Sequence, residues 1–121
     1  MIQITLPYPV SANVYWRHFR GMTVVSKRAL EYRKSVKAIC YAYGVQQMEG
    51  RLAVFLTLCA RKPKKDTGKE PRVIDLDNCA KVMLDALQGV GYENDRQVRA
   101  LSLKYGDPVP GGCLNVRIVK A

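Results

Sequence analysis

The sequence predicts a single α+β domain, residues 1–121, with a mixed β-sheet and two helices. Segments with the period of two that marks strands and segments with helical periodicity follow one another in the order β-β-α-β-α-β-β. The length of 121 residues suits one domain, and the apolar fraction of 48% is enough for a hydrophobic core. The pattern contains no internal repeat and no low-complexity tract.

The first half of the chain begins with a half-buried strand at residues 2–6, where Ile and Leu alternate with polar residues. Residues 7–21 contain prolines and a glycine and are predicted to form a long loop before a short strand at Met22–Val25. Ser26 is a suitable N-cap for a helix that ends at Gly44. Its predicted buried stripe repeats at helical spacing and consists of Tyr32, Val36, Ile39, Cys40 and Tyr43.

The second half opens with an apolar segment, Leu52–Cys59, which predicts a central strand covered on both faces. Residues 61–72 are rich in Lys and Pro and predict a mobile basic loop. A helix is expected from Leu76 to Gln88, followed by a glycine-rich turn at residues 89–95. Two strands, residues 96–106 and 113–119, close the chain, and the turn residues between them at 107–112 predict a hairpin.

The charge balance points to a polyanionic partner. The net charge is +10 and the isoelectric point is about 9.7, which favours nucleic acid and leaves a merely solubilising surface as the alternative. No apolar run approaches the roughly 18–20 residues that span a bilayer, so a cytoplasmic protein without a membrane partner is expected. The four cysteines are widely spaced and are predicted to be buried free thiols.

The helix after residue 75 is apolar around almost its whole circumference. Only Asp77, Lys81 and Asp85 form a polar stripe, at spacings of four residues. A helix of this kind needs cover on more than one side, which predicts a homodimer packed through it. The alternative is that the first helix of the same chain covers it.

Two aspartates stand at the start of this helix, and a third follows the next turn. Asp77 has an ordinary explanation as a helix cap, whereas Asp75 lies outside the helix and has none. A return of the chain after the helix would bring Asp95 near both, and three converging carboxylates favour a hard divalent cation such as Mg²⁺. Lys81, one turn above Asp77, either reaches the space near the carboxylates or forms an ion pair with Asp77 or Asp85.

The stretches "DLDNCAKVMLDAL" and "ENDRQV" resemble the signature of the RusA family of Holliday junction resolvases. The opening stretch "ITLPYPVSANVYWRHFRG" and the helical stretch "VSKRALEYRKSV" are similar to the N-terminal half of that family. The resemblance runs over nearly the whole chain. It implies a RusA-like fold and an intertwined or helix-packed homodimer of phage or prophage type.

The resemblance further implies an endonuclease that depends on Mg²⁺, with Mn²⁺ as a substitute, and that resolves four-way DNA junctions by paired symmetric nicks in recombination and repair. Asp75, Asp77 and Asp95 would then hold the metal and Lys81 would assist at the scissile phosphate. Asn78 would support the site or touch DNA. Further DNA contacts are expected from basic residues of the two predicted loops: Arg17, Arg20, Lys62, Lys64, Lys65, Lys69 and Arg72.

Several points stay open at this level. Ile74 and Val10 depart from the family pattern, and Glu93 makes the third ligand ambiguous. The aromatic residues of the predicted first loop either stack on bases or pack on the domain itself: Tyr15, Trp16 and Phe19. His18 is expected to make a loop hydrogen bond and not to bind metal. The alternatives to a resolvase are a non-catalytic basic binding module and a nuclease for other branched nucleic acids.

Overall fold

The computed structural model describes residues 1–65 and 68–121. Its main sheet contains β1 (Ile2–Leu6), β4 (Leu52–Cys59), β5 (Val98–Tyr105) and β6 (Cys113–Lys120) in the order β1-β6-β4-β5. Strand β4 is parallel to β5, and the other pairings are antiparallel. The predicted class, an α+β domain with a mixed sheet, is confirmed.

The helices number three in the described chain, one more than predicted. Helices α2 (Lys27–Ala42) and α3 (Leu76–Leu87) match the predicted segments, with the Ser26 hydroxyl capping α2 and Gly44 following it at a φ of 69°. The predicted first loop contains the short helix α1 (Ala12–Tyr15) and strand β2 (Trp16–Phe19), which pairs with β3 (Met22–Val25). Four helical residues are too few for a periodic pattern to show. A 3₁₀ turn, η1 (Asp95–Gln97), precedes β5.

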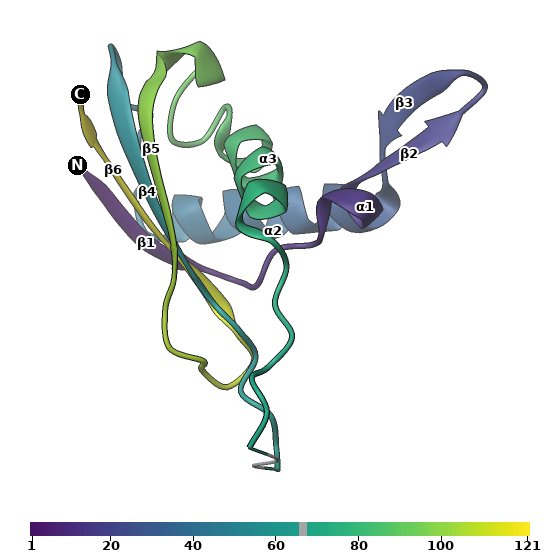
Figure 1. Cartoon of the computed structure of the whole chain (residues 1–121). Helices are drawn as coiled ribbons and strands as arrows, with labels where there is room; N and C mark the ends of the chain where they lie inside the picture. The colour runs from purple at the N-terminus through teal and green to yellow at the C-terminus, as the bar shows by residue number, and fades with distance from the viewer. Residues whose placement is uncertain (66–67) are drawn as a thin grey trace.

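The core lies between one face of the sheet and the helices (Figure 1). Inward side chains of β1, β4 and β6 are buried, and Leu114, Val116 and Ile118 of β6 are at most 1% exposed. On α2 the predicted stripe is buried at Tyr32, Val36 and Cys40, whereas Tyr43 is exposed. None of the described helices combines the length and apolarity needed to cross a bilayer.

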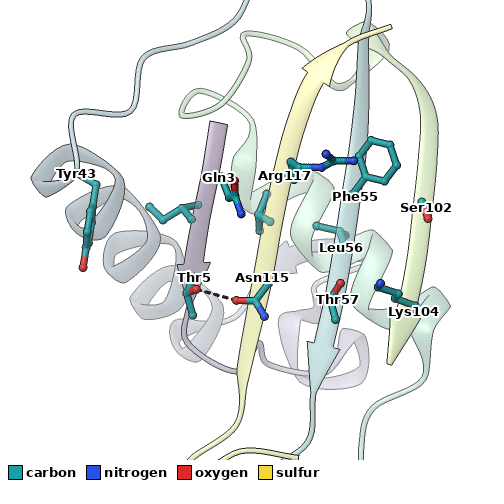
Figure 2. A pocket seen from close by; sticks show the side chains of 12 residues that line it. Gln3, Thr5, Tyr43, Phe55, Leu56, Thr57, Ser102, Lys104, Asn115 and Arg117 are labelled. Carbon is teal, nitrogen blue, oxygen red and sulfur yellow. Dashed lines mark hydrogen bonds between the residues drawn. The ribbon is translucent and has the colours of Figure 1, made fainter. Parts of the chain in front are cut away.

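No described helix covers the opposite face of the sheet, so the prediction that β4 is covered on both faces fails at Phe55 and Thr57, which are half-buried, although Ala53 and Cys59 on the same face are buried. Figure 2 shows this face, where Thr5 donates a hydrogen bond of 2.7 Å to Asn115. The ring of Phe55 is shielded by the guanidinium of Arg117, 4.4 Å from the ring centroid. The side chain of Arg117, and not a second layer of helices, therefore covers Phe55.

The predicted hairpin between the last two strands is also wrong. The chain does turn at residues 107–112, but β6 inserts between β1 and β4 and leaves β5 at the edge of the sheet. Both edges of β6 are paired, one with β1 and the other with β4. Strand β5 keeps Leu101 and Tyr105 partly exposed, which suits an edge position.

Helix α3 is covered within the single chain. Its buried residues are Cys79, Ala80, Val82, Met83, Ala86 and Leu87, and α1, α2 and the sheet all contact it. The argument that a second subunit must cover this helix is therefore wrong, and the alternative of cover by the other helices is correct. The three buried cysteines, Cys40, Cys59 and Cys79, are free thiols as predicted, while Cys113 is half-buried.

Candidate active site

Asp75 and Asp77 lie at the N-terminal end of α3. Asp75 is the N-cap residue, yet its carboxylate accepts no capping hydrogen bond, and Asp77 lies in the first turn. The helix cap was expected at Asp77 and falls two residues earlier, on Asp75. Both side chains are exposed, and neither forms an ion pair within 4.0 Å with another described residue. Two carboxylates on a helix N-terminus present their oxygens to solvent next to the positive end of the helix dipole.

The backbone immediately before this pair is held from two sides. The N–H of Ile74 donates to the Tyr8 hydroxyl at 2.9 Å, and the Tyr105 hydroxyl donates to the Ile74 carbonyl at 3.1 Å. Tyr8 comes from the segment after β1, and Tyr105 ends β5. The backbone at the start of α3 is therefore fixed by Tyr8 and Tyr105, although the two carboxylates themselves are on the surface.

The polar stripe of α3 continues from the carboxylates toward the middle of the helix. Lys81 is exposed one turn beyond Asp77, and no ion pair to Asp77 or Asp85 is formed among the residues described. Its amine therefore remains available near the carboxylates. Asn78 is half-buried beside the pair.

Asp85 has a structural role at the far end of the same stripe. It accepts a hydrogen bond from the hydroxyl of the fully buried Tyr15, and the Arg33 guanidinium lies 3.8 Å away. Burial, and then the Asp85 carboxylate, raise the pKa of Tyr15 well above its ordinary value, so the phenol stays protonated and donates. Asp85 thus joins α1, α2 and α3.

Asp95 lies beside the opposite end of α3. Its backbone N–H is 3.4 Å from the side-chain oxygen of Gln88, the C-cap of α3. The helix from Asp77 to Gln88 spans roughly 16 Å at about 1.5 Å per residue. Within one chain, therefore, Asp95 does not join Asp75 and Asp77. Among residues 1–65 and 68–121, no group of three or more His, Cys, Asp or Glu side chains is placed to hold a metal ion.

Gln97 fixes the turn that carries Asp95. Its side-chain oxygen accepts from the N–H groups of Glu93 and Asn94 at 3.0 and 3.1 Å, and its amide nitrogen donates to the carbonyls of Met48 and Gly50 at 3.0 Å each. Asn94 in turn caps η1. The Asp95 backbone is thus held in one conformation by an amide whose donors and acceptor are all used.

The donor chemistry of Asp75 and Asp77 fits Mg²⁺ or Mn²⁺. Mg²⁺ takes one or two carboxylates together with waters and phosphate oxygens, and here two exposed carboxylates form no ion pair with any other residue among 1–65 and 68–121. The pair of one chain alone supplies a partial ligand set.

The predicted DNA-contacting residues are exposed and fall in two groups. Arg17 and Arg20 belong to the β2–β3 hairpin, and the others belong to the segment leading to α3: Lys62, Lys64, Lys65, Lys69 and Arg72. The described part of this segment extends from the body of the domain and leads to the start of α3 (Figure 1). Asp66 and Thr67 of the predicted loop lie outside the described residues. The second group directly precedes the start of α3 in the chain.

The aromatic residues of α1 and the hairpin, which were expected either to stack on bases or to pack on the domain, differ in their exposure. Tyr15 is buried and Trp16 half-buried against the core, whereas Phe19 is 52% exposed. His18 lies with Nδ1 3.3 Å from the Thr23 hydroxyl, the expected loop hydrogen bond.

A shallow hollow of about 570 Å³ lies on the outer face of the sheet, and its lining includes neither Asp75 nor Asp77. Its lining side chains include Thr57, Lys104 and Asn115, and none of them is acidic (Figure 2). The hollow supplies no carboxylate for metal binding.

Sequence reasoning missed the residues that hold the acidic groups in place. Tyr8 and Tyr105 each make one hydrogen bond to the backbone of Ile74, and Gln97 donates to the carbonyls of Met48 and Gly50, all distant in the sequence. The one available signal was Gln97 itself, a polar residue two positions after Asp95 and directly before a strand.

Comparison with known proteins gives one consistent result. The sequence model of the family described as Endodeoxyribonuclease RusA matches residues 7–118. The crossover junction endodeoxyribonuclease of Enterobacteria phage HK97 is 34% identical over 119 residues, 98% of this chain and 93% of the relative. Similar proteins of the same name occur in Escherichia coli strain K12, 32% identical over 97% of this chain and 92% of the relative, and in Enterobacteria phage 82, 31% identical over the same shares.

Proposed function

The chain belongs to the RusA family of endodeoxyribonucleases, and from this premise we propose that it resolves four-way DNA junctions by metal-dependent hydrolysis, in DNA recombination and repair. The observation that carries the proposal is the exposed Asp75–Asp77 pair, with Lys81 one turn away, in a chain whose full-length relatives are named crossover junction endodeoxyribonucleases.

The chemistry follows from the donor set. Asp75 and Asp77 would hold the metal, which would supply a Lewis acid for a phosphoryl oxygen and would lower the pKa of a water. A water oxygen attacks phosphorus, the bond to one deoxyribose oxygen breaks, and a proton ends on that leaving oxygen. Lys81 places a positive charge beside the phosphate, where negative charge grows during the reaction.

We place the third carboxylate on a second subunit. Helix α3 runs from Asp75 toward Asp95, and β5 runs back until Tyr105 contacts Ile74. If two copies pack antiparallel along α3 and β5, the Asp95 end of one lies beside the Asp75 end of the other. The site would then comprise Asp75 and Asp77 of one chain and Asp95 of the partner subunit.

The exposed edge of strand β5 supports such a contact, whereas the sequence had suggested a dimer that covers α3. It is an eight-residue edge strand, and long edge strands are normally protected from pairing. Leu101 and Tyr105 on its inner face are 38% and 48% exposed. An isologous dimer along this edge would cover them and relate two active sites by a two-fold axis, as paired symmetric nicks require.

The basic groups described above would supply most of the affinity. Contacts between Lys or Arg and phosphates release counterions, so binding should weaken steeply as salt increases. The segment of residues 62–72 is well placed for this role, because it leads directly into the acidic pair.

One experiment tests the function against its alternatives. The protein is incubated with a four-way junction, a flap, a duplex and RNA, each with Mg²⁺, with Mn²⁺ and without metal. We expect symmetric nicks in the four-way junction only, and only with metal. Nicking of the flap in preference would favour a different branched substrate, and no nicking at any salt would favour a non-catalytic binding module.

The matched variants for this assay are Asp75→Asn and Asp107→Asn. Asp75→Asn should abolish nicking and leave junction binding equal or tighter, because one negative charge near the phosphates is removed. Asp107, an exposed aspartate in the turn after β5, is outside the site, and its variant should nick normally. Full cleavage by Asp75→Asn would overturn the proposed metal site.

A further inference from the structure

The β2–β3 hairpin is a separate projection of the domain. Its two strands pair only with each other and extend away from the main sheet and helices (Figure 1). The turn residues Arg20 and Gly21 have φ values of 50° and 74°, and positive φ at both central positions is typical of the tight turns that close twisted hairpins. The tip is thus a compact turn and not a loose loop.

The base and the tip of the hairpin differ in their surroundings. Trp16 and Val25 pair across its base and pack against the core. Phe19 and Met22 pair at its tip and are 52% and 64% exposed. These two apolar side chains at the end of the projection do not pack against the hydrophobic core of the described chain, and they are suited to contact a partner.

The charges around Phe19 indicate what kind of partner this is. The guanidinium carbons of Arg17 and Arg20 lie 5.6 and 5.3 Å from the centroid of its ring. Aromatic rings and guanidinium planes both stack on nucleobases, and arginines bind phosphates. A second copy of this cationic tip would be repelled by it, so charge favours nucleic acid as the occupant.

The base of the hairpin is joined firmly to the helix that carries the acidic pair. The Ser26 N–H donates to the Tyr15 carbonyl at 2.7 Å and closes the base of the hairpin. The buried Tyr15 donates its hydroxyl hydrogen to Asp85 of α3. Asp85 lies eight residues beyond Asp77, roughly 12 Å along the helix. The position of the tip is therefore defined relative to the site.

We propose that Phe19 is inserted at the exchange point of a four-way DNA junction and stacks on an exposed base, with Arg17 and Arg20 on the adjoining phosphates. The inference rests on the proposed function and extends it to the choice of substrate. In a continuous duplex each base is stacked on both sides, and Phe19 has no open base to contact. At an exchange point the stack is interrupted, so the hairpin selects branched DNA by its geometry.

The test compares Phe19→Ala, Phe19→Trp and Tyr41→Ala in the full-length protein. Tyr41 is an 89% exposed aromatic residue of α2 and serves as the matched control. Binding to a four-way junction and to a duplex is measured without divalent metal, with 2-aminopurine at the exchange point. Phe19→Ala should lower junction affinity about tenfold, the usual effect of losing one base–aromatic stack, and leave duplex affinity unchanged.

The fluorescence and the salt dependence separate stacking from charge. Wild-type protein, Phe19→Trp and Tyr41→Ala should change the 2-aminopurine signal, and Phe19→Ala should not. Phe19→Ala should keep the wild-type slope of log affinity against log salt, whereas Arg17→Gln should reduce its magnitude by about one. Thermal unfolding of each variant checks that the fold is intact.

Two results would overturn the inference while leaving the proposed function in place. One is junction binding and nicking by Phe19→Ala equal to wild type. The other is dissociation of a wild-type dimer into monomers by Phe19→Ala, which would make the hairpin a contact between subunits. Wild-type protein that binds duplex as tightly as the junction, and nicks neither, would overturn both proposals.

Discussion

Complementation between inactive subunits tests whether the acidic site is shared by two chains. The perturbation is co-expression of Asp75→Asn with Asp95→Asn, each carrying a different affinity tag so that mixed dimers can be isolated. Because Asp95 lies beside the C-terminal end of α3 and Asp75 at its N-terminal end, the shared arrangement places these substitutions in the same site of a mixed dimer. The other site of that dimer then contains only wild-type carboxylates.

The magnitude follows from counting sites. Random pairing of equal amounts gives about half mixed dimers, each with one intact site of two, so roughly a quarter of the wild-type sites should be active. Each variant alone should be inactive. If instead all three carboxylates came from one chain, every site in the mixture would lack one of them and no activity would return.

A supercoiled plasmid that extrudes a four-way cruciform reports the number of active sites per dimer. Wild-type protein should make two nicks and release linear DNA, whereas the mixed dimer should make one nick and release open circles. A mixture of Asp75→Asn with Asp77→Asn is the control, because both substitutions fall in the same half of the shared site and should restore nothing. Isolated mixed dimers of Asp75→Asn and Asp95→Asn that leave the plasmid intact would refute the shared site.

Other expectations concern the residues that hold the site. Gln97→Leu removes the hydrogen bonds that order the Asp95 turn, and junction nicking should fall at least tenfold while gel-shift binding is retained; unchanged nicking would show that the turn keeps its shape without them. Tyr15→Phe removes the donor to Asp85, and urea unfolding should show a loss of about 1–3 kcal/mol. Burial raises the pKa of Cys79 to about 11, so at pH 8 in the folded protein iodoacetamide should modify half-buried Cys113 first, as peptide mass mapping would show.

Local structure was largely predictable from the sequence, because its determinants are local. The Ser26 cap and Gly44 bound α2 as expected, and the alternation in β1 and β6 placed their buried faces correctly. Strand neighbours were not predictable in the same way. The turn residues before β6 require a change of direction, but they do not specify that β6 pairs with β1 and β4 and not with β5.

In the candidate site, too, the positions set by local sequence were predictable and the position set by distant contacts was not. Asp75, Asp77 and Lys81 occupy one end of α3 because their spacing is within a single helix and its cap. The position of Asp95 depends on how the chain leaves the helix, and the expected return to the helix start does not occur within one chain. The position of the Asp95 turn is instead fixed by Gln97, which binds the carbonyls of Met48 and Gly50, distant in the sequence.

The carboxylate of Asp75 does not make the capping hydrogen bond that would stabilise α3. An aspartate at an N-cap normally accepts a backbone hydrogen bond, which is worth about 1 kcal/mol, and here that bond is not made. The backbone next to it is fixed by Tyr8 and Tyr105 instead, so the helix start is ordered without using the carboxylate. Such departures from local rules are expected at functional sites. Helix α3 therefore begins next to a backbone position that Tyr8 and Tyr105 fix, and the two exposed carboxylates are left for the proposed cation.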